Sequence, residues 1–222
     1  MKLGFLYAGQ GSQHPGMGAD LYERFPTFRA VLDSAAARVD FDLKEVSFTD
    51  AKGVLNQTRY TQPCMVAFAA GVTALLKDAG IVPEYAAGLS LGEYSALQCA
   101  GVFDAPTAIS LVAFRGQAMA NAVQGRPCGM AAVLGMDRES LKAVCQQASD
   151  AGVVECTNFN CPGHIFISGD AAAVAEAISY LMDHPGERRA MGERARQMAE
   201  DLFDREKTYE KILDLFSGEG SL

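Results

Sequence analysis

The sequence of 222 residues has no run of about 18 consecutive apolar residues, the length that a membrane-spanning helix needs. Its apolar start, from Leu3 to Ala8, is shorter than the roughly 7–15-residue apolar core of a secretory signal peptide. These two absences exclude the usual signals for membrane insertion and export. The sequence therefore predicts a cytoplasmic protein with no membrane partner.

Cysteine pairs of the C-x-x-C type are absent, and the three histidines do not stand at metal-ligand spacing from any cysteine. Without such patterns the sequence predicts neither a bound metal nor a disulfide framework. The cysteines are scattered through expected helices, strands and loops, as is usual for reduced and mostly buried thiols. They are Cys64, Cys99, Cys128, Cys145, Cys156 and Cys161.

Basic residues are too few for a protein that binds nucleic acid. The 19 Lys and Arg are outnumbered by 27 Asp and Glu, so that the net charge is −8 and the pI is near 4.9. Binding to nucleic acid or to an anionic membrane needs a basic face that displaces counterions. The excess of acidic residues therefore excludes nucleic acid and anionic membranes as partners. An acidic protein partner would have to bind at a local cluster of Lys and Arg.

Apolar and charged residues, at 49% and 21%, are within the range of ordinary globular proteins. From Met1 to about Ala122 short apolar segments alternate with helical periodicity, which predicts an α/β layer architecture. A strand is expected at Leu3–Ala8, followed by a Gly-rich loop to Gly18, and a second strand at 85–89. Helices are expected at 21–37, 63–79, 92–100 and 108–120.

The second part of the chain has a different order of expected helices and strands. Strand, helix, strand, strand and helix are expected at 130–135, 138–148, 153–158, 164–168 and 171–181, which is most of a ferredoxin-like unit without its closing strand. Sixteen of the 34 residues from Asp183 to Phe216 are charged. We predict an α/β core over residues 1–125, an incomplete ferredoxin-like subdomain over 126–182 and a charged, amphipathic helical tail over 183–222.

The segment Gly88-Leu89-Ser90-Leu91-Gly92 follows an expected strand and precedes an expected helix. In this context G-x-S-x-G is typical of a nucleophile elbow, a strained turn with no room for a Cβ beside the serine. Such a turn exposes the hydroxyl and lets the backbone N–H of Leu91 stabilise an oxyanion. Taken alone, the pattern also fits a serine N-cap in an ordinary loop between a strand and a helix, which is the commoner case.

Four further motifs accompany the elbow in order along the chain. They are Gly9-Gln10-Gly11-Ser12-Gln13, Thr61-Gln62-Pro63, Arg115-Gly116, and the run from Asn158 to Gly163. With 88–97, they resemble the malonyl-CoA:acyl-carrier-protein transacylase family over Met1 to about Ile178. The resemblance implies an α/β-hydrolase-like parallel sheet with an inserted ferredoxin-like subdomain, here truncated. It also implies malonyl-CoA and acyl carrier protein as substrates, with no further cofactor.

The same resemblance implies roles for single residues. It assigns Ser90 as the nucleophile, the backbone of Gln10 and Leu91 as the oxyanion hole, and Arg115 as the partner of the malonyl carboxylate. Gln62, Asn158 and Asn160 resemble residues that line the pocket. From the residues alone, Gln10 could instead satisfy local backbone, Arg115 could lie on the helix surface, and the asparagines could form a turn.

The chain departs from the family pattern at two points. Leu89 stands where many relatives have histidine, which bears on acyl selectivity. The catalytic histidine that the family implies falls after the ferredoxin-like unit, where this sequence has no counterpart. Only His14, His164 and His184 are present, and His14 is the nearest surrogate, although a solvated loop residue is the simpler reading. We therefore expect very slow multiple turnover.

Three functions remain open at this stage. The first is malonyl transfer in fatty-acid or polyketide synthesis, through an ester on Ser90. The second is a truncated or fused relative that binds without turnover. The third, a serine esterase, explains neither the loop from Gly9 to Gln13 nor Arg115.

Overall fold

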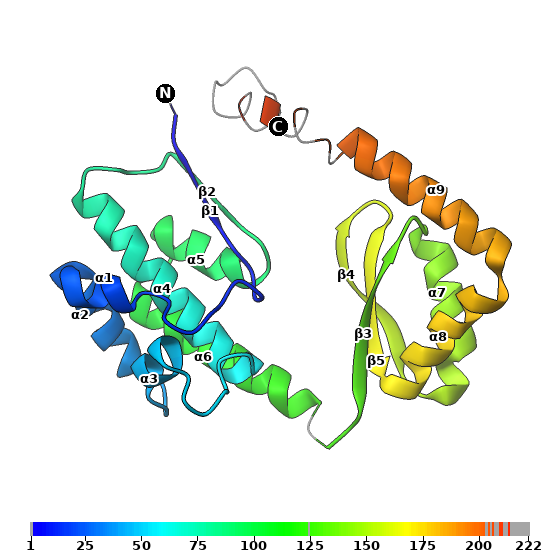
Figure 1. The fold of residues 1–222 in the computed structure, drawn as a ribbon, viewed down its shortest axis with the longest axis horizontal. Helices are drawn as coiled ribbons and strands as arrows, with labels where there is room; N and C mark the ends of the chain where they lie inside the picture. The colour runs from blue at the N-terminus through cyan, green and yellow to red at the C-terminus, as the bar shows by residue number, and fades with distance from the viewer. Residues whose placement is uncertain are drawn as a thin grey trace. The chain divides into compact units, whose positions relative to one another are not determined.

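The computed structural model describes residues 2–123, 125–202, 204, 206, 209, 210 and 213. The chain forms two compact units, Met1–Ala122 and Val123–Leu222, which we call unit 1 and unit 2. Both combine helices with a small sheet, so that the protein is of the α/β class (Figure 1). No helix among the described residues is long and apolar enough to cross a membrane.

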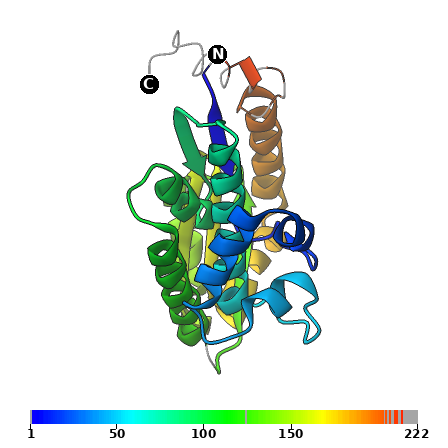
Figure 2. The same ribbon diagram turned by 90° about the vertical axis from the view of Figure 1, so that its left-hand side faces the viewer.

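Unit 1 contains a two-stranded parallel sheet, β1 (Gly4–Tyr7) and β2 (Tyr85–Gly88), with Gly4 opposite Tyr85 and Tyr7 opposite Gly88. The connection between the strands carries most of the unit's helices, and α4 packs against both α2 and α6 (Figure 2). The helices are α1 (Ala19–Arg24), α2 (Pro26–Ala36), α3 (Leu43–Phe48), α4 (Thr58–Asp78), α5 (Leu91–Cys99) and α6 (Ala105–Ala122).

Two expectations for the helices of unit 1 are wrong. The single helix expected over 21–37 is two helices, because Phe25 is extended (φ −121°, ψ 112°) immediately before Pro26. A proline ring disfavours the helical conformation of the residue before it, so the break falls where the sequence places Pro26. The helix expected from Pro63 begins instead at Thr58 and includes Pro63.

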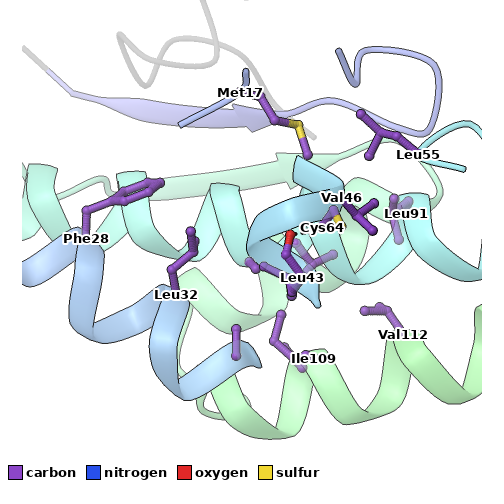
Figure 3. Close-up of a cluster of buried hydrophobic side chains, with 14 residues drawn as sticks. Met17, Phe28, Leu32, Leu43, Val46, Leu55, Cys64, Leu91, Ile109 and Val112 are labelled. Atoms are coloured by element: carbon purple, nitrogen blue, oxygen red, sulfur yellow. Dashed lines mark hydrogen bonds between the residues drawn. The ribbon is translucent and has the colours of Figure 1, made fainter. Parts of the chain in front are cut away.

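The core of unit 1 lies among its helices. Phe28 of α2, Leu43 of α3 and Ile109 of α6 are fully buried in one cluster (Figure 3). Met17, from the Gly-rich loop, and Leu91, the first residue of α5, belong to the same cluster. Two segments that carry the sequence motifs are therefore fixed by apolar side chains in this core.

Unit 2 is a three-stranded antiparallel sheet with helices. The sheet order is β3-β5-β4. The central strand β5 forms a hairpin with β4 and pairs on its other side with β3. The elements are β3 (Cys128–Leu134), α7 (Arg138–Gln147), the short 3₁₀ helix η1 (Ala148–Ala151), β4 (Val154–Cys161), β5 (His164–Asp170), α8 (Ala171–Asp183) and α9 (Pro185–Leu202).

The asparagines of the 158–163 motif lie in a strand. Asn158 and Asn160 belong to β4, which extends to Cys161. The pairing of β4 with β5 shifts register between Cys156 and Asn158 and again between Phe159 and Cys161. The turn is made by Pro162 and Gly163, and Gly163 has φ of +73°. The alternative that the asparagines form the turn is therefore wrong, because the glycine supplies the left-handed conformation that the turn needs.

Helix α9, at the start of the charged tail, packs against the other helices and the sheet of unit 2. Met191 is 6% exposed and joins the cluster formed by β3, β5, α7 and α8. A Cβ on Gly135 would lie 2.1 Å from the carbonyl oxygen of Met191, and Arg194 Nε donates to the Gly135 carbonyl at 2.6 Å. The sequence has a further set of apolar residues at helical spacing in the tail, Tyr209, Ile212, Leu213 and Phe216. Ile212 and Phe216 lie outside the described residues.

The six cysteines carry free thiols. Cys64, Cys99 and Cys145 are buried, whereas Cys128 is exposed. Burial raises the pKa of the Cys64 thiol to about 12, so this group stays protonated at neutral pH.

The packing of α9 predicts a large effect of Met191→Ala on stability. Removing a buried methionine side chain should lower the free energy of unfolding by about 2–5 kcal/mol. The control Met182→Ala, at a methionine that is 67% exposed on α8, should change it by less than about 0.5 kcal/mol. Urea unfolding followed by circular dichroism measures both, and equal effects would mean that α9 does not belong to the core of unit 2.

Candidate active site

Ser90 sits between the end of β2 and the start of α5 with an unusual backbone conformation. Its φ of 52° and ψ of −100° make it one of two non-glycine residues with positive φ among those described, and it is exposed. A serine in such a conformation costs about 1–3 kcal/mol, which the surrounding structure has to offset. This is the strained strand-to-helix turn that the G-x-S-x-G pattern predicts.

The glycines on either side of Ser90 are required by close backbone approach. A Cβ on Gly88 would lie 2.1 Å from the carbonyl carbon and oxygen of Gly92, and a Cβ on Gly92 would lie 2.2 Å from the carbonyl oxygen of Tyr7. Contacts this short with backbone cannot be relieved by moving a side chain. The pattern therefore reflects packing of the end of β1, the end of β2 and the start of α5 in one place.

The ordinary N-cap alternative does not describe Ser90. The residue holds the N-cap position of α5, but its side chain makes no capping hydrogen bond. A usual N-cap residue has extended backbone, whereas Ser90 has positive φ. The N–H of Leu91 is that of the first helical residue, which has no partner within its own helix, and the helix dipole adds partial positive charge there. A negative oxygen next to Ser90 would meet this group.

Arg115 lies beside the serine hydroxyl. Its Nη2 donates to Ser90 Oγ at 3.3 Å, and its guanidinium carbon is 5.7 Å from the centre of the Tyr94 ring. The side chain is half-buried and so differs from a freely solvated surface arginine. Gly116 lets α6 approach α4 closely, since a Cβ there would lie 2.9 Å from the Thr58 carbonyl. This approach fixes the position of Arg115 on α6.

The loop after β1 is tied to the start of α4. Gln10 Nε2 donates to Thr58 Oγ1 at 3.1 Å, so its side chain bonds another element and not local backbone. Gln13 accepts from the Gly11 N–H at 2.8 Å and donates to Asn56 Oδ1 at 2.8 Å. These bonds order the loop that carries the backbone N–H of Gln10.

Gln62 is completely buried on α4. Its Nε2 contacts Met119 Sδ at 3.3 Å, and its Oε1 has no hydrogen-bond partner among the described residues. Met119 follows Arg115 by one turn of α6. The side chain of Gln62 on α4 therefore contacts α6 one turn after Arg115. Leaving a buried group such as its Oε1 unpaired costs about 1–3 kcal/mol.

Other residues singled out from the sequence belong to other elements. Asn158 is on β4 of unit 2. His14 Nδ1 is 3.1 Å from the carbonyl oxygen of Pro15, and within the described part of unit 1 no histidine bonds to Ser90 Oγ. In unit 2, His184 stacks on Tyr180 and its Nδ1 is 2.7 Å from the Tyr180 carbonyl oxygen.

Sequence reasoning missed Tyr94 and Thr58. Tyr94 lies one helical turn after Ser90, and its ring flanks Arg115. Thr58 starts α4 and holds Gln10. A signal for Tyr94 was present, because residues i and i+4 share a helix face, but nothing in the sequence paired Thr58 with Gln10.

An exposed serine on a strained elbow, with a helix N-terminus and an arginine beside it, has the features of a nucleophile with oxyanion donors. The chain belongs to the acyl transferase domain family, which its sequence matches over residues 4–200. The match continues past Ile178 through α8 and into α9.

The relatives are named for malonyl transfer. The malonyl CoA-acyl carrier protein transacylase of Bacillus subtilis is 40% identical over 191 residues, which is 86% of this chain and 60% of that protein. The solved malonyl CoA-acyl carrier protein transacylase from Clostridium perfringens superposes with a TM-score of 0.72 at 37% identity, over 82% of this chain and 58% of its own.

A second solved structure is a type II polyketide-synthase acyl-carrier protein in complex with its malonyl-transacylase. It matches at 36% identity and a TM-score of 0.69, over 80% of this chain and 58% of that chain. The chain therefore spans about 60% of the length of the relatives that it matches.

The close approach at the elbow predicts a severe effect of Gly92→Ala. The added Cβ would meet the Tyr7 carbonyl at 2.2 Å, so the change should destabilise unit 1 by more than about 2 kcal/mol and slow the labelling of Ser90 by a fluorophosphonate probe. The control Gly192→Ala lies in open space on α9 and should be neutral or stabilise by up to about 1 kcal/mol. An unchanged labelling rate in Gly92→Ala would contradict the elbow geometry.

Proposed function

We propose that this chain carries the acyl-accepting machinery of an acyl-carrier-protein S-malonyltransferase. In the first step Ser90 Oγ attacks the thioester carbonyl of malonyl-CoA, the C–S bond breaks, malonyl is held as an ester, and coenzyme A leaves as a thiol with the proton that Ser90 gives up. In the second step the thiol of acyl carrier protein attacks that ester, the ester C–O bond breaks, and the thiol proton restores the Ser90 hydroxyl. The observation that carries the proposal is the pairing of a strained, exposed Ser90 with Arg115 at 3.3 Å.

Ser90 supplies the nucleophile, and two backbone groups serve its oxyanion. The N–H groups of Leu91 and Gln10 are the proposed donors to the oxygen that becomes negative during attack. Leu91 is held by its buried side chain, and Gln10 by its bond to Thr58. Donors that are already in place before the reaction stabilise such charge without reorganisation.

Arg115 is the proposed partner of the free carboxylate of malonyl. A guanidinium is planar and always charged, and it can bind both carboxylate oxygens at once. In the structure Arg115 Nη2 already points at Ser90 Oγ, so a carboxylate held by Arg115 would bring the attached acyl group to the nucleophile. Because the group is a fixed cation, it cannot accept the serine proton, which needs another acceptor.

The wider architecture supports the same proposal. The parallel pair β1 and β2 with an elbow after β2 fits the hydrolase-like core proposed for residues 1–125. The order of β3, α7, β4, β5 and α8, with β5 central, fits the incomplete ferredoxin-like subdomain proposed for 126–182. We assign the charged segment 183–222 as the third part of the chain. Asn158 and Gln62 are the proposed pocket residues, and the cytoplasm is the proposed location. No cofactor besides the malonyl-CoA substrate is required.

Acylation of Ser90 is the direct test of this function. After mixing with malonyl-CoA, intact-mass analysis should show one malonyl adduct, and peptide mapping should place it on Ser90. Ser90→Ala should abolish the adduct, whereas Ser12→Ala, in the neighbouring loop, should retain it. An adduct that persists in Ser90→Ala would contradict the assignment of the nucleophile.

The carboxylate role of Arg115 predicts a difference between two acyl donors. Arg115→Ala should slow acylation from malonyl-CoA by about ten- to hundredfold, the range expected for loss of a hydrogen bond to a charged group. Acylation from acetyl-CoA, which has no free carboxylate, should change much less. Arg115→Lys keeps the charge without the planar fork and should fall between the two. Equal losses for both donors would show that Arg115 is structural.

A further inference from the structure

Arg115 reaches Ser90 without a charged partner of its own. Its Nη2 donates to the serine hydroxyl at 3.3 Å, which is longer than the usual N–H···O bond, and the acceptor is neutral. Of the unit 1 residues that the structure describes, no Asp or Glu forms an ion pair with Arg115. A guanidinium has several N–H donors, so that others can serve an incoming anion. The bond to Ser90 is by itself a weak constraint on so long a side chain.

The ring of Tyr94 is a second contact of this guanidinium. The ring centre is 5.7 Å from Arg115 Cζ, within the range of a cation–π interaction. Tyr94 is half-buried and packs against the core of unit 1, whereas Ser90 is exposed. A tyrosine side chain turns about only two torsions, so a packed ring is a rigid support. The ring is therefore the firmer of the two contacts.

The elbow itself brings the ring to this place. Tyr94 follows Ser90 along α5, and residues at this i, i+4 spacing lie on one face of a helix. Leu91 and Ser95, which are 1% and 4% exposed, hold α5 against the rest of unit 1. The turn that presents the nucleophile thus also fixes the ring, and Arg115 of α6 contacts both.

We propose that Tyr94 is a positioning residue that sets the preference of the site for acyl groups with a free carboxylate. Its ring holds the guanidinium of Arg115 where both carboxylate oxygens of malonyl can bind while the acyl carbon lies at Ser90. The inference rests on the proposed function and adds to it a determinant of acyl preference that acts through Arg115.

The contact with Tyr94 gains importance when Ser90 is acylated. Oγ then becomes the alkoxy oxygen of an ester, which is a poor hydrogen-bond acceptor because its lone pair is shared with the acyl carbonyl. Arg115 loses its bond to Oγ, whereas the reaction leaves the ring of Tyr94 unchanged. Tyr94 then keeps the guanidinium beside the carboxylate of the bound malonyl group.

Two other roles for Tyr94 lead to different expectations. If its hydroxyl bound the substrate, Tyr94→Phe would be as harmful as Tyr94→Leu. If the ring served only to pack the core, its loss would affect every acyl donor alike. A role through Arg115 needs the aromatic face, does not need the hydroxyl, and is confined to donors that carry a carboxylate.

The experiment measures acylation of Ser90 from malonyl-CoA and from acetyl-CoA by intact mass, with both rates taken on one preparation of the 222-residue protein. Their ratio then does not depend on how much of the preparation is folded. Tyr94→Leu should lower the ratio of malonyl to acetyl rates by about three- to tenfold, the loss expected for a cation–π contact. Tyr94→Phe should keep the ratio within about twofold. In an Arg115→Ala background, Tyr94→Leu should lower the ratio no further, because the two residues act as one unit.

Tyr60 provides a matched control. It is a half-buried tyrosine of α4 whose ring centre is 5.4 Å from Arg59 Cζ, but that arginine is paired with Asp40. Tyr60→Leu therefore removes a similar contact between a tyrosine and an arginine away from Ser90. It should leave the ratio of the two rates within about twofold of the unsubstituted protein.

Protection by malonate tests the same contact without any thioester. Malonate held by Arg115 should slow the labelling of Ser90 by a fluorophosphonate probe. Tyr94→Leu should raise the malonate concentration for half-protection by about three- to tenfold, whereas Tyr94→Phe should not. If neither CoA donor acylates the unsubstituted protein, the proposed function fails, and this measurement still decides the role of Tyr94.

Several outcomes would overturn the inference about Tyr94 while leaving acylation of Ser90 intact. They are a ratio that Tyr94→Leu does not change, a further fall in the Arg115→Ala background, and an equal fall in Tyr60→Leu. Equal losses in Tyr94→Leu and Tyr94→Phe would assign the effect to the hydroxyl. An absence of malonate protection in the unsubstituted protein, or half-protection that Tyr94→Leu does not shift, would also contradict it.

Discussion

The geometry of the candidate site depends on one close backbone approach, where the end of β1, the end of β2 and the start of α5 meet without room for a Cβ. Gly88 and Gly92 make this approach possible, because any side chain there would collide with backbone. The chain has to reverse between β2 and α5 within a single residue, and Ser90 takes the positive φ that results. Exposure of the hydroxyl and the position of the Leu91 N–H both follow from this turn.

Helix α4 holds the parts of the site that the elbow does not. Thr58, at its start, holds Gln10, and Gln62, one turn further, contacts α6 beside Arg115. Gly116 permits the approach of α6 to α4. The motifs of unit 1 are far apart in the sequence but adjacent in the fold, because each one lies at a contact with α4 or with the elbow.

The sequence predicted the elements that carry strong local signals. The elbow, the first strand and the α/β class were accessible because glycine spacing and apolar runs report directly on local backbone. The break at Phe25 was also encoded, by Pro26, but helical periodicity on both sides concealed it. The extension of β4 beyond Asn158 to Cys161 and the packing of Met191 in unit 2 could not be predicted, because pairing with β5 and burial in the core of unit 2 are tertiary effects. The contact between Ser90 and Arg115 was accessible only through family resemblance, since 25 residues separate them.

The energetics of the elbow suggest that it is formed before any substrate binds. The unusual conformation of Ser90 costs about 1–3 kcal/mol. On its two sides, Leu91 and Met17 are 1% and 6% exposed in the core of unit 1, and burial of such side chains contributes about 1.5–3 kcal/mol each. The two anchors together outweigh the strain. Because both belong to unit 1, along with Gln10, Gln62 and Arg115, the proposed machinery for accepting an acyl group can be held in place by the core of that unit.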